Sequence, residues 1–169
     1  YFGDKLGIYS GSSIGALTIN LVGTNTITAE DATGTLSCGI NVMGSLTISG
    51  TDTATLTAKG GSSSNSSYGI YGKNTITIRN SAQVSATGGT AVNESYGIFG
   101  MGDITISDSA QVSATSGTAY TSLAINKRPV FTGYTSYQWR TAKEGAFTPS
   151  TTKAYEWANT HTYGEIKPQ

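Results

Sequence analysis

The chain has 169 residues, a formal net charge of zero and only 12% charged residues. Such a chain lacks the basic face that binds nucleic-acid phosphates, so the composition excludes a nucleic-acid partner. No apolar run reaches the ~18 residues of a membrane-spanning helix, and a single cysteine allows no intrachain disulfide. Because the chain starts at Tyr1 inside a predicted structured region and contains no signal peptide, we expect a fragment of a longer protein with neighbouring domains.

A sequence repeat organises the first 126 residues. It is clearest between residues 68–88 and 96–116, which share YGI, ITI and SAQVSAT at an offset of 28 residues. Related x-Gly-Ile-x segments begin at five positions, with offsets of 32, 30, 28 and 27 residues: Leu6, Cys38, Tyr68, Tyr96 and Leu123. Periods of about 20–50 residues are typical of solenoids and propellers.

Each repeat contains three short segments in which apolar and small polar residues alternate. In the third repeat these are residues 68–71, 76–78 and 84–86. The alternation predicts strands with one buried face, and the intervening Gly, Asn, Asp and Ser predict turns. Three strands are too few for a propeller blade, so the sequence predicts an all-β fold, a right-handed parallel β-helix of four to five coils.

Stacking of the coils predicts columns of side chains. With strict alternation, the first residue and the Ile of each x-Gly-Ile-x segment face the core, which places Cys38 and Tyr68 inside. The glycine and the last residue then face outward. We therefore expect a flat glycine floor beside a column of outward side chains: Tyr9, Asn41, Tyr71, Phe99 and Asn126.

The outward column is a candidate ligand site at Tyr9, Asn41, Tyr71 and Phe99, because an aromatic face can pack against the C–H face of a sugar. The alternative is that these rings stack on each other or are covered by a loop or the tail. A second outward column contains Thr-x-Thr pairs, as in ice-binding solenoids. In later coils Gln83 and Ser85 occupy the positions of these threonines. We therefore interpret the threonines as ordinary residues of an exposed strand face.

Composition changes after residue 126. Residues 127–169 contain all three prolines, both tryptophans and 6 of the 10 Lys and Arg. Proline disrupts central strands and a solenoid needs a cap over its last coil. We predict repeats over residues 1–126 and a β-rich cap or small module over residues 127–169. The alternative is an aromatic ligand-binding surface that includes Trp139 and Trp157. Short strands are expected at residues 133–141, 153–157 and 162–167.

The acidic residues are scattered over different coils. Polysaccharide hydrolases and lyases need two or three carboxylates held together, so the pattern argues against catalysis. The adjacent Glu30 and Asp31 are predicted to lie in a solvated loop, and Asn80 and Asp108 to form a stacked turn ladder. His161 is the only histidine, so we predict no metal site and no cofactor. Cys38 is predicted to be a small buried residue.

Three motifs carry a resemblance to a known group of proteins. Residues 68–72, 76–78 and 84–89 resemble repeats in surface and secreted proteins of gut and other anaerobic bacteria, some described as carbohydrate-binding-domain-containing. One characterised group is a right-handed parallel β-helix that binds plant polysaccharide and carries calcium on aspartates. Residues 137–141 and 161–166 are similar to a closing segment of such proteins. This chain lacks the aspartate clusters, so the resemblance does not extend to calcium.

The resemblance implies an extracellular or cell-surface location and a polysaccharide or host-cell glycan as partner. Together with the repeat, it predicts a non-catalytic module of a bacterial surface or secreted protein that binds carbohydrate or mediates adhesion. A purely structural spacer is the alternative.

Overall fold

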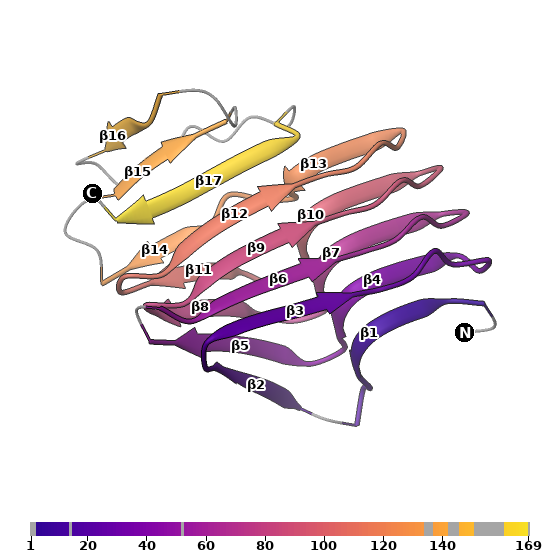
Figure 1. The fold of residues 1–169 in the computed structure, drawn as a ribbon, viewed down its shortest axis with the longest axis horizontal. Helices are drawn as coiled ribbons and strands as arrows, with labels where there is room; N and C mark the ends of the chain where they lie inside the picture. The colour runs from indigo at the N-terminus through magenta and orange to yellow at the C-terminus, as the bar shows by residue number, and fades with distance from the viewer. Residues whose placement is uncertain are drawn as a thin grey trace.

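The structure is a computed structural model that describes residues 3–13, 15–51, 53–133, 137–141, 146–150 and 161–168. Within these ranges the regular elements are all strands (Figure 1). None of the described segments is an apolar helix long enough to cross a membrane.

The described chain winds into a parallel β-solenoid of four complete coils (Figure 1). The first coil contains β1 (Lys5–Ser10), β2 (Ala16–Leu21) and β3 (Thr24–Thr28). The next contains β4 (Leu36–Val42), β5 (Ser45–Gly50) and β6 (Thr55–Lys59). The third contains β7 (Ser66–Gly72), β8 (Ile76–Asn80) and β9 (Gln83–Thr87), and the fourth β10 (Glu94–Gly100), β11 (Ile104–Ser107) and β12 (Gln111–Thr115). A fifth coil begins with β13 (Thr121–Ile125) and β14 (Val130–Thr132). The predicted all-β parallel β-helix of four to five coils is confirmed.

Equivalent strands of successive coils form three sheets. Sheet A has the order β1-β4-β7-β10-β13, and sheet B contains β2, β5, β8, β11 and β14. Sheet C contains β3, β6, β9 and β12, and these solenoid strands are parallel within each sheet. The register follows the sequence repeat, so that Ile40, Ile70 and Ile98 align in sheet A.

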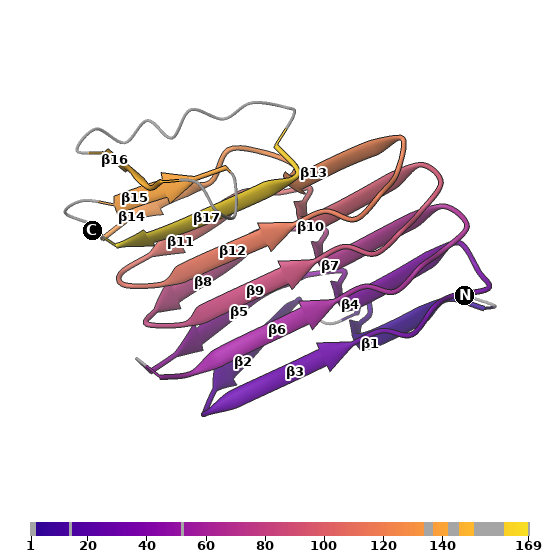
Figure 2. The same ribbon diagram turned by 45° about the horizontal axis from the view of Figure 1, so that its top comes forward.

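Sheet C continues into antiparallel strands. β17 (Tyr163–Pro168) pairs with β12, β15 (Tyr137–Arg140) pairs with β17, and β16 (Thr148–Ser150) pairs with β15 (Figure 2). β15 and β17 correspond to the strands expected at residues 133–141 and 162–167, whereas residues 153–157 lie outside the described residues. The described strands after residue 126 therefore extend sheets B and C.

The core lies between the three sheets and consists of stacked aliphatic side chains. Its largest fully buried members are Ile40, Leu46, Ile48, Leu56, Ile70, Ile76, Ile78, Ile98, Ile104, Ile106 and Ile125. Full burial of one such side chain contributes about 1.5–3 kcal/mol. Because the core side chains of each coil are covered only by the coils on either side, this stabilisation of the fold depends on the stacking of the coils.

Sheets A and C lie in close contact at the glycines of the x-Gly-Ile-x segments. A Cβ on Gly69 would lie 2.5 Å from the backbone N of Thr87 in β9, and one on Gly97 would lie 2.7 Å from the N of Thr115 in β12. Because the opposite backbone fills the space of a side chain, only glycine fits there. Gly69 and its neighbour Ile70 thus both face the interior, and strict alternation is broken. The predicted outward glycine floor is wrong.

Buried serines connect successive coils where sheets A and C approach. The Ser67 hydroxyl donates a hydrogen bond to the Gly61 carbonyl at 2.7 Å and accepts one from the N–H of Gly89 at 2.7 Å. Ser95 repeats this pattern one coil later, with the Gly89 carbonyl at 2.7 Å and the N–H of Gly117 at 2.8 Å. Each hydroxyl therefore satisfies backbone groups of two different coils.

Asn80 and Asp108 occupy the same turn in successive coils. Both have a left-handed backbone with φ of 61°, and the Asp108 carboxylate accepts a hydrogen bond from the Asn80 N–H at 3.0 Å. Asn and Asp tolerate this conformation better than most residues. The predicted turn ladder is confirmed.

Candidate functional site

A second apolar cluster lies on the outer face of sheet A, the face turned away from the core. Its buried members are Cys38, Tyr68 and Tyr96, and the partly buried members are Leu6, Leu36, Tyr71, Phe99 and Leu123. The first residue of each segment faces outward because the next residue, the glycine, faces the interior. The prediction that Cys38, Tyr68 and Tyr96 join the core is therefore wrong, although their predicted alignment is confirmed.

The four rings of this cluster are in mutual contact. The Tyr71 and Phe99 rings are stacked, with centroids 5.5 Å apart and planes 3° apart. The more buried Tyr68 and Tyr96 rings stack at 5.8 Å, and Tyr96 meets Phe99 edge-on at 5.0 Å. Such pairs contribute about 0.5–1.5 kcal/mol each beyond their burial. The rings therefore stack on one another, while Tyr71 and Phe99 keep part of their surface exposed.

The cluster is uncharged apart from one carboxylate at its side. The Tyr68 hydroxyl donates a hydrogen bond to Glu94 at 2.7 Å, and burial, followed by this bond, raises the pKa of Tyr68. Burial also raises the pKa of the Cys38 thiol, which donates to the Ile40 carbonyl at 3.0 Å. Since only a thiolate is a good nucleophile, Cys38 has a packing role here.

The four predicted site residues of the repeats share one column of sheet A. The register aligns Tyr9 with Asn41, Asn41 with Tyr71, and Tyr71 with Phe99. Tyr9 is 45% exposed, whereas Asn41 is fully buried. Asn41 thus has the predicted position in the column without the exposure that a platform residue would need.

A cavity of about 250 Å³ lies beside this column. Its lining residues are Thr35, Leu36, Asn41, Met43, Asn65, Ser66, Tyr68 and Tyr71. Among the described residues, the lining combines hydroxyl and amide groups with two aromatic rings and contains no charged side chain. It can therefore offer neutral hydrogen bonding beside an apolar surface.

The tryptophans of the C-terminal segment are separate from this column. Trp139, in β15, is partly buried and packs against the main core. It aligns with the buried Ile166 of β17, so its ring helps to cover the last coil. Trp157 lies outside the described residues.

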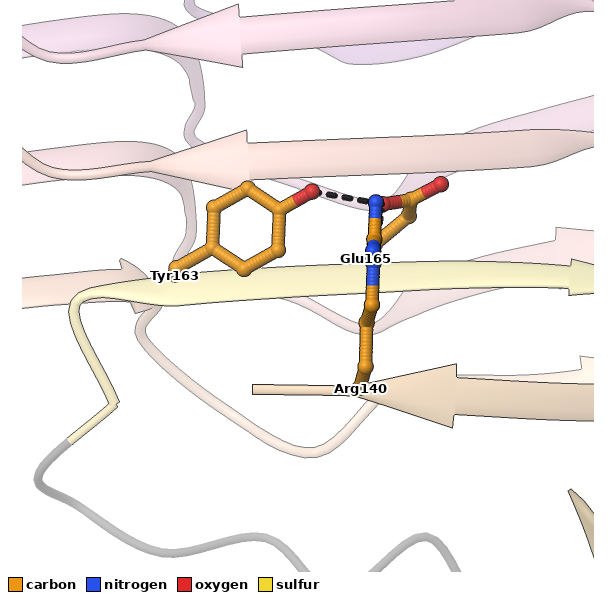
Figure 3. A network of polar contacts seen from close by, with 3 residues as sticks. All are labelled: Arg140, Tyr163 and Glu165. Carbon is orange, nitrogen blue, oxygen red and sulfur yellow. Dashed lines mark hydrogen bonds and ion pairs between the residues drawn. The ribbon is translucent and has the colours of Figure 1, made fainter. Parts of the chain in front are cut away.

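The antiparallel strands β15, β16 and β17, called the cap below, carry on their outer face a polar network that the sequence did not predict (Figure 3). The Glu165 carboxylate accepts hydrogen bonds from the Arg140 Nε at 2.7 Å and the Tyr163 hydroxyl at 2.5 Å. The bond to Glu165 raises the pKa of Arg140, and burial raises the pKa of Tyr163. The Arg140 guanidinium also lies 4.6 Å from the centre of the Phe147 ring. Glu165 therefore joins β15 to β17.

A larger cavity of about 350 Å³ lies on the outer face of sheet C. Its lining residues are Thr55, Leu56, Thr57, Gln83, Val84, Ser85, Gln111, Val112, Ser113 and Glu165. The register places Ser85, Ser113 and Glu165 in one line across the strands. One carboxylate, already bound by Arg140, does not make the acid pair of a glycosidase.

The one adjacent acidic pair that the sequence analysis considered, Glu30 and Asp31, is solvated. Glu30 and Asp31 are exposed and lie outside the strands, as expected. Glu30 pairs with Lys5 at 3.2 Å, and the N–H of Ser62 donates to Asp31 at 2.7 Å, which lowers the pKa of Asp31. In the part of the chain that the structure describes, no three His, Cys, Asp or Glu side chains form a group that could hold a metal ion.

No protein-family model, curated protein or solved structure matches this chain. Function is therefore inferred from its own residues.

Proposed function

We propose that this chain is a non-catalytic module that binds carbohydrate at the outer face of sheet A, in a bacterial cell-surface or secreted protein. The observation that carries the proposal is the partly exposed stack of Tyr71 and Phe99, backed by Tyr68 and Tyr96. Rings held on one side by other rings lose little conformational freedom when a ligand packs against them, which favours binding.

The polar groups around the stack support a neutral glycan. Thr35, Asn65 and Ser66 line the cavity beside Tyr71 and supply hydroxyl and amide groups. Such groups both donate and accept hydrogen bonds, as sugar hydroxyls do. A neutral lining gives no electrostatic preference for phosphate or other strong anions.

Both cavities support a binding role without catalysis. Within the described part of the chain, the smaller has no acidic side chain in its lining, and the larger has Glu165 alone, which Arg140 and Tyr163 bind. Glycoside hydrolysis by a carboxylate pair needs two acids about 5–9.5 Å apart.

A glycan array and pull-down on insoluble polysaccharides test the proposal with the wild type and a Tyr71→Ala/Phe99→Ala double variant. We expect the wild type to bind and the double variant to lose binding. Tyr120→Ala is the matched control, since Tyr120 is 92% exposed and lies outside the cluster. A melting curve of each variant establishes that it is folded. Binding that survives the double variant would move the site to Trp139 and Trp157.

A structural spacer is the second candidate. The observation in its favour is that Tyr71 and Phe99 cover one face of each other's rings. A spacer predicts that the wild type binds no glycan, which the same array decides.

A further inference from the structure

Asn41 has a buried amide that the fold does not use. It lies in sheet A between Tyr9 of the first coil and Tyr71 of the third. Its side chain is fully buried, and neither Nδ2 nor Oδ1 has a hydrogen-bond partner among the described residues. A buried polar group without a partner is destabilising. For stability alone, an aliphatic side chain would be the better residue at this position.

Asn126 shows how an asparagine in this column can be satisfied. It follows Ile125 as Phe99 follows Ile98, so it extends the same column. Its Nδ2 donates to the Gly100 carbonyl at 3.0 Å, and its Oδ1 accepts from the Gly100 N–H at 2.9 Å. Asn41 makes no such pair, so the column itself does not account for its amide.

Asn41 also lines the 250 Å³ cavity. Every other polar side chain in the lining has a hydrogen-bond partner. The hydrogen-bonded pairs are Thr35 with Asp4, Asn65 with Ser66 and Asn93, Tyr68 with Glu94, and Tyr71 with the Met101 sulfur. Among these side chains, the Asn41 amide is therefore the one whose donor and acceptor are both unengaged.

We propose that Asn41 recognises one neutral, hydroxyl-bearing ring, a single pyranose unit, in this cavity. Its Nδ2 donates to one ring hydroxyl and its Oδ1 accepts from the neighbouring hydroxyl, while the ring packs against Tyr71. This assignment rests on the proposed function and names the unit that the site takes. The cavity is smaller than the ~300–1,000 Å³ of sites for drug-sized ligands, which fits one ring. The covered amide becomes accessible when the half-exposed Tyr9, its neighbour in the column, changes rotamer, because side chains at a surface do so quickly.

The test compares Asn41→Leu with the wild type, because leucine has the same branching at Cγ and no amide. Binding is measured by pull-down on the polysaccharides that the wild type retains and by NMR titration with methyl glucoside, methyl galactoside and methyl mannoside. We expect a saturable shift of the Asn41 side-chain NH₂ signals with at least one of these glycosides. We expect Asn41→Leu to bind at least tenfold more weakly and to melt at a higher temperature than the wild type.

Asn126→Leu is the matched control. It removes two hydrogen bonds to Gly100, so we expect a lower melting temperature and unchanged sugar binding. The opposite directions of the two melting shifts separate a recognition residue from a structural one.

The results distinguish this inference from the proposed function. The role of Asn41 would be overturned if Asn41→Leu bound as well as the wild type or melted at a lower temperature. It would also be overturned if none of the methyl glycosides shifted the Asn41 side-chain signals. The proposed function would stand in these cases if Tyr71→Ala/Phe99→Ala still loses polysaccharide binding. A wild type that binds no glycan would overturn both.

Discussion

The hydroxyl of Ser67 in the third coil accepts a hydrogen bond from the N–H of Gly89, in the loop that leads to the fourth coil, at 2.7 Å. The same hydroxyl donates to the carbonyl of Gly61 in the preceding loop, and Ser67 is fully buried. Ser67→Ala leaves both backbone groups without this partner. We expect the free energy of unfolding to fall by about 2–4 kcal/mol, measured by urea denaturation. Ser12→Ala, at an exposed position, is the control, and an equal effect of the two changes would refute the role of Ser67 in connecting the coils.

Gly69→Ala tests the close approach of sheets A and C. The new Cβ would lie 2.5 Å from the backbone N of Thr87, which cannot move aside as a flexible side chain could. We expect a loss of ~3 kcal/mol or more, or failure to fold. A Cβ on Gly15 would meet nothing within 4 Å, so Gly15→Ala should change stability little. Equal stability of both variants would show that the sheets do not meet at Gly69.

Ile98→Ala tests the stacked core. Ile98 is fully buried and aligns with Ile70 and Ile125 in the coils on either side. Its truncation leaves a cavity that the neighbouring rungs cannot fill, so we expect a loss of about 2–5 kcal/mol in urea denaturation. Ile98→Val removes one methylene and should cost about 0.5–1.5 kcal/mol. If Ile98→Ala lowered the free energy of unfolding no more than Ile98→Val, the result would contradict tight packing around Ile98.

Alkaline pH should destabilise the fold through its buried tyrosines. The pKa of Tyr68 is raised in the folded state by burial and by Glu94, whereas an unfolded tyrosine ionises near pH ~10. Unfolding therefore releases a proton from Tyr68 above this pH, so the contribution of Tyr68 to stability is full below pH ~10 and is lost as the pH rises toward the folded pKa. We expect the melting temperature to fall above pH ~10, and to fall less steeply in Tyr68→Phe.

The slope of this pH dependence is the result to compare, because Tyr68→Phe also loses the hydrogen bond to Glu94 at neutral pH. Tyr120→Phe changes an exposed residue and should leave the slope unchanged. Equal slopes in the wild type and Tyr68→Phe would exclude Tyr68 as the cause.

Glu165→Gln should loosen the cap. The Glu165 carboxylate binds Arg140 and Tyr163, and neutral glutamine cannot reproduce the charged pair with Arg140. We expect faster amide hydrogen exchange in β15 and β17, with little change in β7. Glu30→Gln changes an exposed ion pair and should leave exchange unaltered. Faster exchange throughout the solenoid would mean that the network stabilises more than the cap.

The repeat made most of the fold predictable. When the same residues recur at nearly the same offset, stacking in register buries every coil alike, so strand order and the alignment of Ile70 with Ile98 follow from the sequence. The direction of Tyr68 was not predictable from alternation. It depends on the approach of β9 to Gly69, a contact between two segments that no single segment reveals.

The candidate site was predictable in position but only partly in environment. The column of Tyr9, Asn41, Tyr71 and Phe99 follows from the register. The burial of Asn41 depends on the side chains around it in neighbouring coils. The partners of Glu165 come from two strands, and the only local signal is the two-residue spacing of Tyr163 and Glu165, which places both on one face.

The third and fourth coils pair residue for residue in all three sheets, at a constant offset of 28 residues, as in Ser66 with Glu94 and Gln83 with Gln111. Deleting one such block would bring β4 against β10 through contacts of the kind that β4 already makes with β7. The protein can thus become shorter or taller by whole rungs of about 4.8 Å without needing a new kind of junction. Each rung added in this way would also lengthen the outer aromatic column, so height and the number of ring positions would increase together.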